Sequence, residues 1–147
     1  MKQLETLEEI EKTIVVDASP EVVFKALTDE KELVQWMPSE AKMDARLGGE
    51  FEFKYHWSAR GLDTVLRGKI LELVPNKRIS YTWNAETTEH EKRITGAVVT
   101  WTLESLSDGK TRVTLVQSGV VKQFREDAEK GWIFFMGRLA DHCKGRS

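Results

Sequence analysis

An amphipathic helix near the C-terminus constrains the fold of this chain more than any other feature. Between Gly131 and Cys143, large apolar residues recur at the helical spacing i, i+3, i+4 and i+7, at Trp132, Phe135, Met136 and Leu139. Residues 42–118 show instead the pattern of strands. A helix with so large an apolar face must cover an apolar surface, and the only partner of sufficient size is the preceding sheet. A long helix that crosses a curved sheet can enclose a cavity between the two.

Length and charge limit the classes of protein to which the chain can belong. With 147 residues, 40% of them hydrophobic, it is expected to form one domain over residues 1–147, with a core at about 10–143. A chain of this size buries roughly 68–70% of its unfolded surface, so it needs no disulfide or metal for stability. The formal net charge of −2 offers no basic field to a polyphosphate backbone, so nucleic acid is not an expected partner.

No segment of the sequence predicts secretion or a membrane span. The acidic N-terminus lacks the apolar core of a signal peptide, and no apolar run reaches the length of a spanning helix. The single cysteine, Cys143, has no partner for an internal disulfide, which fits a reducing compartment. We therefore expect a cytoplasmic location.

The N-terminal part predicts one strand and then two short helices. Residues 10–16 alternate and end in an apolar run, which indicates a strand. Ser19 and Pro20 are typical of a helix start, because Ser caps a free N–H group and Pro suits the first helical position. A second helix over about residues 30–36 directs Trp36 inward and ends before Pro38.

The middle of the chain predicts a run of antiparallel strands. They are expected over residues 42–47, 50–57 and 65–74, and around 79–83, 99–103 and 113–117, with hairpin turns at 48–49 and 107–110. Aromatic and polar residues alternate strictly over 50–57, so one face of the sheet is aromatic and the other polar. Residues 84–96 are polar and predict a mobile loop. This order of elements favours an α+β fold with an antiparallel sheet.

Five segments, in this order, resemble the START/birch-pollen-allergen superfamily (SRPBCC) and, within it, the branch of activator-of-heat-shock-protein-ATPase homologues. The segments are Ala18–Thr28 followed by Trp36, the glycine pair in Leu47–Phe51, Gly68–Pro75 with Ile79–Trp83, Gln117–Gly119, and Gly131-Trp132. The resemblance implies a helix-grip fold: a curved antiparallel sheet of about seven strands on a long C-terminal helix, with two short helices after the first strand. It also implies a cavity that in many relatives accepts apolar or amphipathic small molecules.

The side chains expected between the sheet and the C-terminal helix are the candidate wall of this ligand-binding cavity. A pocket wall and a filled core look alike in a sequence, because both are mostly apolar. Polar atoms among these residues need a partner, which is the sheet, water or a ligand. Residues 58–64 and 120–130 are the expected gates, the second as a loop or a short helix that forms a lid. The candidate wall consists of Trp36, Phe53, Tyr55, Trp57, Tyr81, Trp83, Trp101, Gln117, Trp132, Phe135, Met136 and Leu139.

No catalytic or metal-binding constellation emerges from the sequence, and no cofactor is expected. His142 lies near the apolar stripe, where it is either a general acid/base or a helix-terminal residue that interacts with the helix dipole. Cys143 is adjacent to it and points elsewhere on a helix, so a nucleophile–base pair is not predicted. The histidines and the cysteine share no zinc-ligand spacing.

Three functions from different classes remain open. The first is a binding module that encloses a hydrophobic or amphipathic small molecule. The second, which the family resemblance suggests, is an interaction protein that regulates a chaperone ATPase. The third is a cyclase- or hydrolase-type enzyme that uses the same cavity, for which Arg67 and His142 are the best candidate polar residues.

Overall fold

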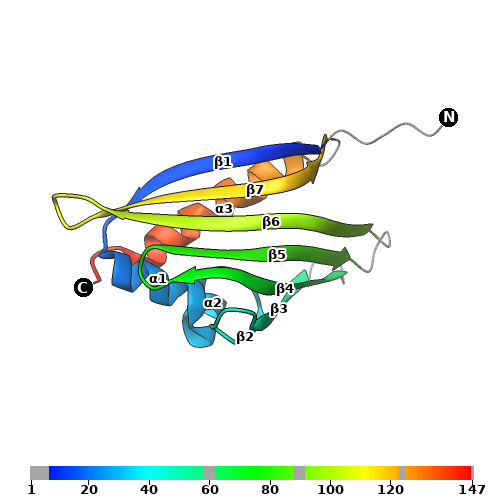
Figure 1. Cartoon of the computed structure of the whole chain (residues 1–147), viewed down its shortest axis with the longest axis horizontal. Coiled ribbons are helices and arrows are strands. Elements are labelled where there is room, and N and C mark those ends of the chain that lie inside the picture. The colour runs from blue at the N-terminus through cyan, green and yellow to red at the C-terminus, as the bar shows by residue number, and fades with distance from the viewer. Residues whose placement is uncertain (1–6, 58–61, 88–91, 123–124, 147) are drawn as a thin grey trace.

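The fold is a curved antiparallel sheet with a long helix along one face (Figure 1). In this computed structural model, the described residues are 7–57, 62–87, 92–122 and 125–146. Seven strands pair in the order β1-β7-β6-β5-β4-β3-β2, and all neighbours are antiparallel. The strands are β1 (Leu7–Val16), β2 (Glu40–Met43), β3 (Glu50–Trp57), β4 (Leu62–Val74), β5 (Arg78–Thr87), β6 (Lys92–Ser105) and β7 (Thr111–Val121).

Helices α1 (Pro20–Thr28), α2 (Glu30–Trp36) and α3 (Arg125–Cys143) lie on one side of the sheet. In Figure 1, α3 runs behind the sheet, and α1 and α2 lie near its C-terminal end. The α+β helix-grip fold predicted from the sequence is confirmed. Within the described ranges, no helix is both long enough and apolar enough to cross a membrane.

The two short helices start as the sequence predicts. Pro20 occupies the first turn of α1, and the Ser19 side chain accepts a hydrogen bond from the Val22 N–H at 3.4 Å. The Asp29 side chain caps α2 in the same way and accepts from the Lys31 N–H at 2.8 Å. These caps satisfy backbone donors that a helix start otherwise leaves free. They fix the entry of both helices beneath the sheet.

The core lies between the inner face of the sheet and α3. On β3, Phe51 and Phe53 are buried, whereas Glu50 is exposed. The predicted separation into an aromatic and a polar face is therefore correct. On α3, the side chains that are buried against the sheet and the other helices are Trp132, Met136, Leu139 and Cys143.

Charged residues attach the beginning of α3 to β1. The Arg125 Nη1 donates to Glu8 Oε1 at 2.9 Å, and its Nε donates to Glu129 Oε1 at 3.0 Å. Lys12 Nζ lies 3.8 Å from the other Glu129 oxygen. Hydrogen bonds to Glu8 and then to Glu129 raise the pKa of Arg125 above its usual value. Because Glu8 and Lys12 belong to the inward side of β1, this contact replaces apolar packing at the first turn of α3.

The end of α3 is attached to α2 and to the segment between β1 and α1. His142 Nε2 lies 2.9 Å from Glu32 Oε1 on α2, and Arg146 Nη1 donates to the same oxygen at 3.1 Å. The Gly145 N–H donates to the Asp17 carbonyl at 2.9 Å. The C-terminal end of the helix is thus held by side chains and by backbone.

The prediction of a mobile loop over residues 84–96 is wrong for the described residues 84–87 and 92–96. β5 continues to Thr87 and β6 begins at Lys92, with Ala85 paired to Ile94. The register shifts between Trp83 and Ala85, opposite Gly96, whose φ is +81°. Such a bulge interrupts the alternation of side chains, so the period of a strand is absent from this part of the sequence. Residues 88–91 lie outside the described residues.

The strand predicted over 42–47 is displaced toward the N-terminus. It is β2, which ends at Met43, and the turn to β3 occupies residues 44–49. The Gly49 N–H donates to the Arg46 carbonyl at 2.9 Å, and Gly48 has a φ of +79°. A Cβ on Gly49 would lie 2.0 Å from the Asp44 carbonyl oxygen, so the turn requires glycine there. The glycine pair therefore marks a turn, as predicted, but a longer one than a two-residue hairpin.

The predicted lid over residues 120–130 is also wrong in the part that the structure describes. Val120 and Val121 belong to β7, and α3 begins at Arg125 rather than near Gly131. The first turns are rich in charge and carry no apolar face, so hydrophobic periodicity cannot reveal them. Ion pairs at i, i+4, such as that between Glu126 and Lys130 at 3.3 Å, support this part of the helix.

Candidate functional site

Five of the twelve candidate wall residues form one closed cluster, which we call the inner cluster: Trp36, Tyr81, Trp101, Gln117 and Trp132. The Trp101 ring packs edge-on against Trp36 and Trp132, at centroid distances of 6.2 and 5.7 Å. Each side chain of the cluster has at most 5% of its surface exposed. Edge-to-face pairs of this kind stabilise a core beyond the area that they bury.

The three indole N–H groups of the inner cluster donate to acceptors within the chain. The Trp101 Nε1 donates to the Tyr81 hydroxyl at 2.8 Å, and the Trp132 Nε1 donates to Gln117 Oε1 at 2.6 Å. The Trp36 Nε1 donates to the Ala26 carbonyl at 2.9 Å. Within the described part of the chain, every fully buried polar side-chain atom has a partner. The chain itself therefore supplies the acceptors for these three indole groups.

Three further wall residues form a second group, which we call the outer group: Tyr55, Trp83 and Phe135. The Tyr55 and Phe135 rings are 5.8 Å apart, so they join β3 to α3. Trp83 lies 5.3 Å from Trp132 and is thus continuous with the inner cluster. Phe135 is only half-buried. Among the described residues, the Trp83 indole N–H has no hydrogen-bond acceptor.

The outer group lies at one end of the sheet. Tyr55 pairs with Thr64 on β4, and Thr64 pairs with Thr87 at the end of β5. Next to it, Phe134 is 56% exposed, and its ring contacts Phe135 at 5.3 Å. The aromatic core therefore reaches the surface between the end of β3 and the first half of α3.

The remaining wall residues are divided between core and undescribed regions. Phe53, Met136 and Leu139 are buried, at 0%, 1% and 0% exposure. The Trp57 side chain and residues 58–61 of the expected gate at 58–64 lie outside the described residues.

Burial keeps the two tyrosines of the site protonated. It raises the pKa of both Tyr55 and Tyr81 far above the ordinary phenol value, and for Tyr55 the neighbouring Tyr81 raises it further. Their hydroxyl groups remain neutral at every physiological pH. They act as hydrogen-bonding groups in an apolar environment and not as bases.

The polar residues considered for catalysis do not lie in the site. Arg67 is exposed on the polar face of the sheet, where its Nε donates to Glu52 Oε2 at 2.9 Å. The same hydrogen bond, as the largest cause, lowers the pKa of Glu52. His142 binds Glu32 at the far end of α3. The interpretation of Arg67 as a cavity residue is therefore wrong.

Cys143 is buried beneath the end of α3, and burial raises its thiol pKa to about 11. A thiol with so high a pKa is mostly protonated at neutral pH and is a poor nucleophile. Among the described residues, no cluster of His, Cys, Asp and Glu has the composition of a metal site.

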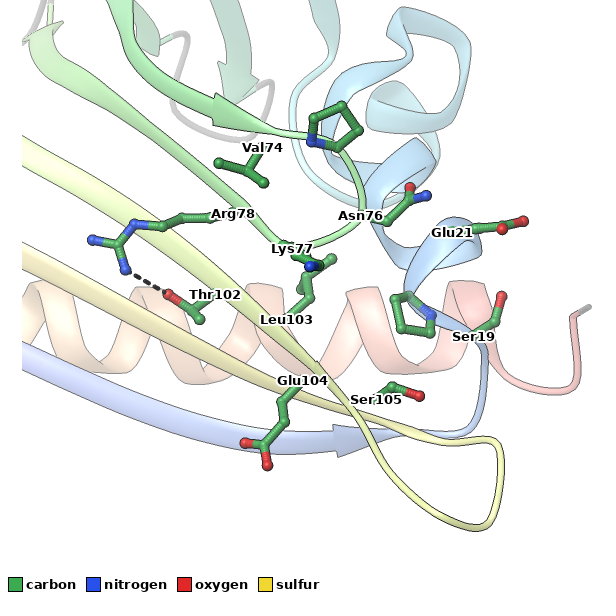
Figure 2. A pocket seen from close by; sticks show the side chains of 12 residues that line it. Ser19, Glu21, Val74, Asn76, Lys77, Arg78, Thr102, Leu103, Glu104 and Ser105 are labelled. Carbon is green, nitrogen blue, oxygen red and sulfur yellow. Dashed lines mark hydrogen bonds between the residues drawn. The ribbon is translucent and has the colours of Figure 1, made fainter.

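A separate groove of about 920 Å³ lies at the opposite end of the sheet, between the start of α1, the β4–β5 turn and the end of β6 (Figure 2). Its lining carries charges of both signs, and two of them have partners: Arg78 pairs with Glu72, and Glu104 accepts from Arg112 at 2.9 Å. The Ser19 side chain caps α1. This arrangement favours no single class of ligand.

Comparison with known families identifies the chain. A family model described as "Activator of Hsp90 ATPase homolog 1-like protein" matches residues 17–144. The chain belongs to this family. The resemblance to the SRPBCC superfamily and to this branch, inferred from five sequence segments, is thereby confirmed. A search of curated proteins found no significant match.

Solved structures agree with this family assignment. Protein CV1439 from Chromobacterium violaceum is 30% identical, with a TM-score of 0.78 over 92% of this chain and 97% of that one. MLL2253 from Mesorhizobium loti is 26% identical, with a TM-score of 0.76 over 95% and 99% of the two chains. The Aha1 dimer from Colwellia psychrerythraea shares the fold, with 22% identity and a TM-score of 0.77 over 95% and 99%.

Sequence reasoning missed the charged contacts that position α3 over the site. Glu8, Lys12 and Arg125 are ordinary surface residues by composition, and the first and last are 117 positions apart. One signal was present: Glu8 and Lys12 share the period-two side of the first strand with Ile10 and Ile14. Charged residues on the inward side of a strand indicate a charged partner across from them.

Proposed function

We propose that this protein binds an apolar or amphipathic small molecule between the sheet and α3, with the outer group as the contact surface. The family and its helix-grip fold are consistent with such a cavity. One observation carries the location: the three indole N–H groups of the inner cluster have acceptors within the chain, whereas the outer group combines a half-buried Phe135 with a Trp83 N–H that lacks an acceptor among the described residues.

The chemistry of the outer group defines a ligand class. Tyr55 and Phe135 offer aromatic surface on which an apolar body can pack. Trp83 offers one donor for a carbonyl, carboxylate or hydroxyl oxygen of the ligand. An apolar contact of about 300 Å² contributes roughly 7 kcal/mol before the entropic cost of binding. This is less than the roughly 8 kcal/mol of a micromolar complex, so a tighter ligand needs the Trp83 hydrogen bond or a larger contact area.

The experiment that tests this proposal is a titration with the apolar fluorescent probe N-phenyl-1-naphthylamine. Phe135→Ala removes a ring of the outer group and is expected to weaken probe binding at least about tenfold, which corresponds to about 1.4 kcal/mol. Phe134→Ala is the matched control, because it removes the adjacent ring from the exposed side of α3. Equal binding by both variants and the wild type, or no binding by the wild type, would contradict the proposal.

Regulation of a chaperone ATPase is the alternative function. It rests on the description of the family and on the name of the Colwellia protein. The exposed apolar residues Ile133 and Phe134, at 59% and 56% exposure, are the feature of this chain that favours it. The test is the ATPase rate of Hsp90 with added protein. A rate increase that Phe134→Ala abolishes would support this alternative, and an unchanged rate would exclude it for that chaperone.

A further inference from the structure

The side of α3 that faces away from the sheet carries a regular stripe. Its residues are separated by three and four positions in turn, which places them on one face of a helix at the spacing of a coiled-coil seam. All of them are exposed, whereas the residues on the opposite, inward side of the same helix are buried. We call this set the outward stripe: Asp127, Lys130, Phe134, Gly137, Asp141 and Lys144.

The outward stripe continues slightly beyond α3. Lys144 follows the last residue of the helix, and its N–H still donates to the Ala140 carbonyl at 3.0 Å. The stripe therefore spans about 25 Å at 1.5 Å per residue. Lys130 also pairs with Glu126, but that pair is exposed and contributes little. It leaves Lys130 available to another partner.

The stripe is complementary to itself in an antiparallel arrangement. A two-fold axis that passes α3 midway between Phe134 and Gly137 brings Asp127 opposite Lys144 of the partner subunit. The same operation brings Lys130 opposite the partner's Asp141 and Phe134 opposite the partner's Gly137. Each pair then occurs twice, as in any isologous interface. Every charge of the stripe meets the opposite charge, and the one large apolar side chain meets the one residue without a side chain.

Gly137 supports this match independently of the charges. It lies inside a helix, where glycine is less favourable than alanine by about 1 kcal/mol. No contact inside the chain explains it, because a Cβ built at Gly137 has no described atom within 4 Å. The missing side chain leaves room for a ring to approach the backbone. The Phe134 ring is available for this, since it is 56% exposed and its ring contacts with described residues are with Phe135 and, at 5.7 Å, with Arg138.

We propose that the outward stripe is a docking surface for a second copy of this chain, with the two α3 helices antiparallel. Flanking residues fit the same register, because Ile133 lies opposite Arg138 of the partner subunit and its methyl groups can cover the stem of that side chain. Formation of the pair leaves the inward side of α3 and the outer group unchanged. The proposal is therefore independent of the proposed ligand.

The test is a charge-reversal cycle measured by sedimentation velocity over a wide range of concentrations. Wild-type protein is expected to form dimers, and Lys130→Asp or Asp141→Lys alone to weaken dimerisation at least about tenfold, because like charges then face each other twice. The double variant restores opposite charges with unchanged net charge and is expected to return to near the wild-type dissociation constant. Lys69→Asp on β4 is the matched control, because it changes an exposed lysine on the polar face of the sheet, which faces away from α3.

A second variant separates association from folding. Gly137→Gln fills the gap opposite Phe134 and is expected to raise the thermal stability of the monomer, because glutamine is the better helix former, while it weakens the dimer. A wild-type protein that stays monomeric at every concentration would overturn the proposal. Dimerisation that is indifferent to the single reversals, or that the double variant does not restore, would overturn it equally.

Discussion

The inner cluster and the outer group are built from the same residue types but differ in how they satisfy polar atoms. In the inner cluster, the indole groups of Trp101 and Trp132 donate to Tyr81 and Gln117. In the outer group, Phe135 is half-buried and Trp83 has no acceptor among the described residues. The comparison teaches that one aromatic face is satisfied unevenly. The indole N–H groups of the inner cluster have acceptors within the chain, and the end of the same face at Trp83 is the proposed ligand contact.

The largest expected effect comes from removal of the centre of the inner cluster. Trp101 is fully buried between Trp36 and Trp132. Trp101→Ala is expected to lower the free energy of unfolding by about 3–5 kcal/mol, through lost burial and the cavity that remains. Urea denaturation followed by circular dichroism measures this loss. A loss below about 1 kcal/mol would mean that the cluster is not the closed core described above.

The next effect concerns a single hydrogen bond of the inner cluster. Gln117→Leu removes the acceptor of the buried Trp132 N–H and is expected to cost about 1–3 kcal/mol of unfolding free energy. In a Trp132→Phe background the N–H is absent, so the same substitution should cost markedly less. A double-mutant cycle measures this coupling. Additive losses would show that the two side chains do not depend on each other.

Substitution in the outer group should affect probe affinity more than the free energy of unfolding. Phe135→Ala removes a half-buried ring and is expected to cost about 1 kcal/mol of unfolding free energy, while it lowers probe affinity about tenfold. Urea denaturation and the probe titration are compared on the same sample. A large loss of stability with unchanged affinity would assign Phe135 to the core and remove the distinction between the two groups.

The smallest expected effect on stability concerns Cys143. It is measured through the rate at which the thiol is alkylated. Burial raises the thiol pKa of Cys143 to about 11, so little of the reactive thiolate is present at neutral pH. Alkylation by iodoacetamide at neutral pH should therefore be about 100-fold slower than for a free cysteine with a pKa two units lower. The rate should continue to rise as the pH increases from 9 to 11. Over the same range the stability that the protonated thiol contributes is lost. A rate that levels off near pH 9 would show that the end of α3 is not closed.

The sequence predicted the elements that have a regular apolar period. It missed those that depend on contacts between residues far apart in the chain. The apolar period of Trp132, Met136 and Leu139 located the second half of α3, and strict alternation located β3. The charged first turns of α3 have no apolar period, because Arg125 meets Glu8 of β1 instead of the core. The bulge beside Gly96 hid the continuity of β5 and β6 in the same way.

For the site, the sequence predicted which residues are buried, but not which of them belong to the inner cluster and which to the outer group. Tyr55, Tyr81 and Trp83 look equivalent along their strands. The partners that distinguish them, such as Trp101 for Tyr81 and Phe135 for Tyr55, come from other strands or from α3. Such pairs depend on register and on the rotation of α3. A single sequence does not contain that information.

Native mass spectrometry of the purified protein, followed by denaturing extraction, tests the central claim most directly. The account predicts a small apolar or amphipathic adduct on the wild type and on Phe134→Ala, released on denaturation and lost or strongly reduced in Phe135→Ala. A wild-type protein that retains no adduct even after incubation with the apolar probe would contradict the account, as would an adduct that Phe135→Ala retains in full.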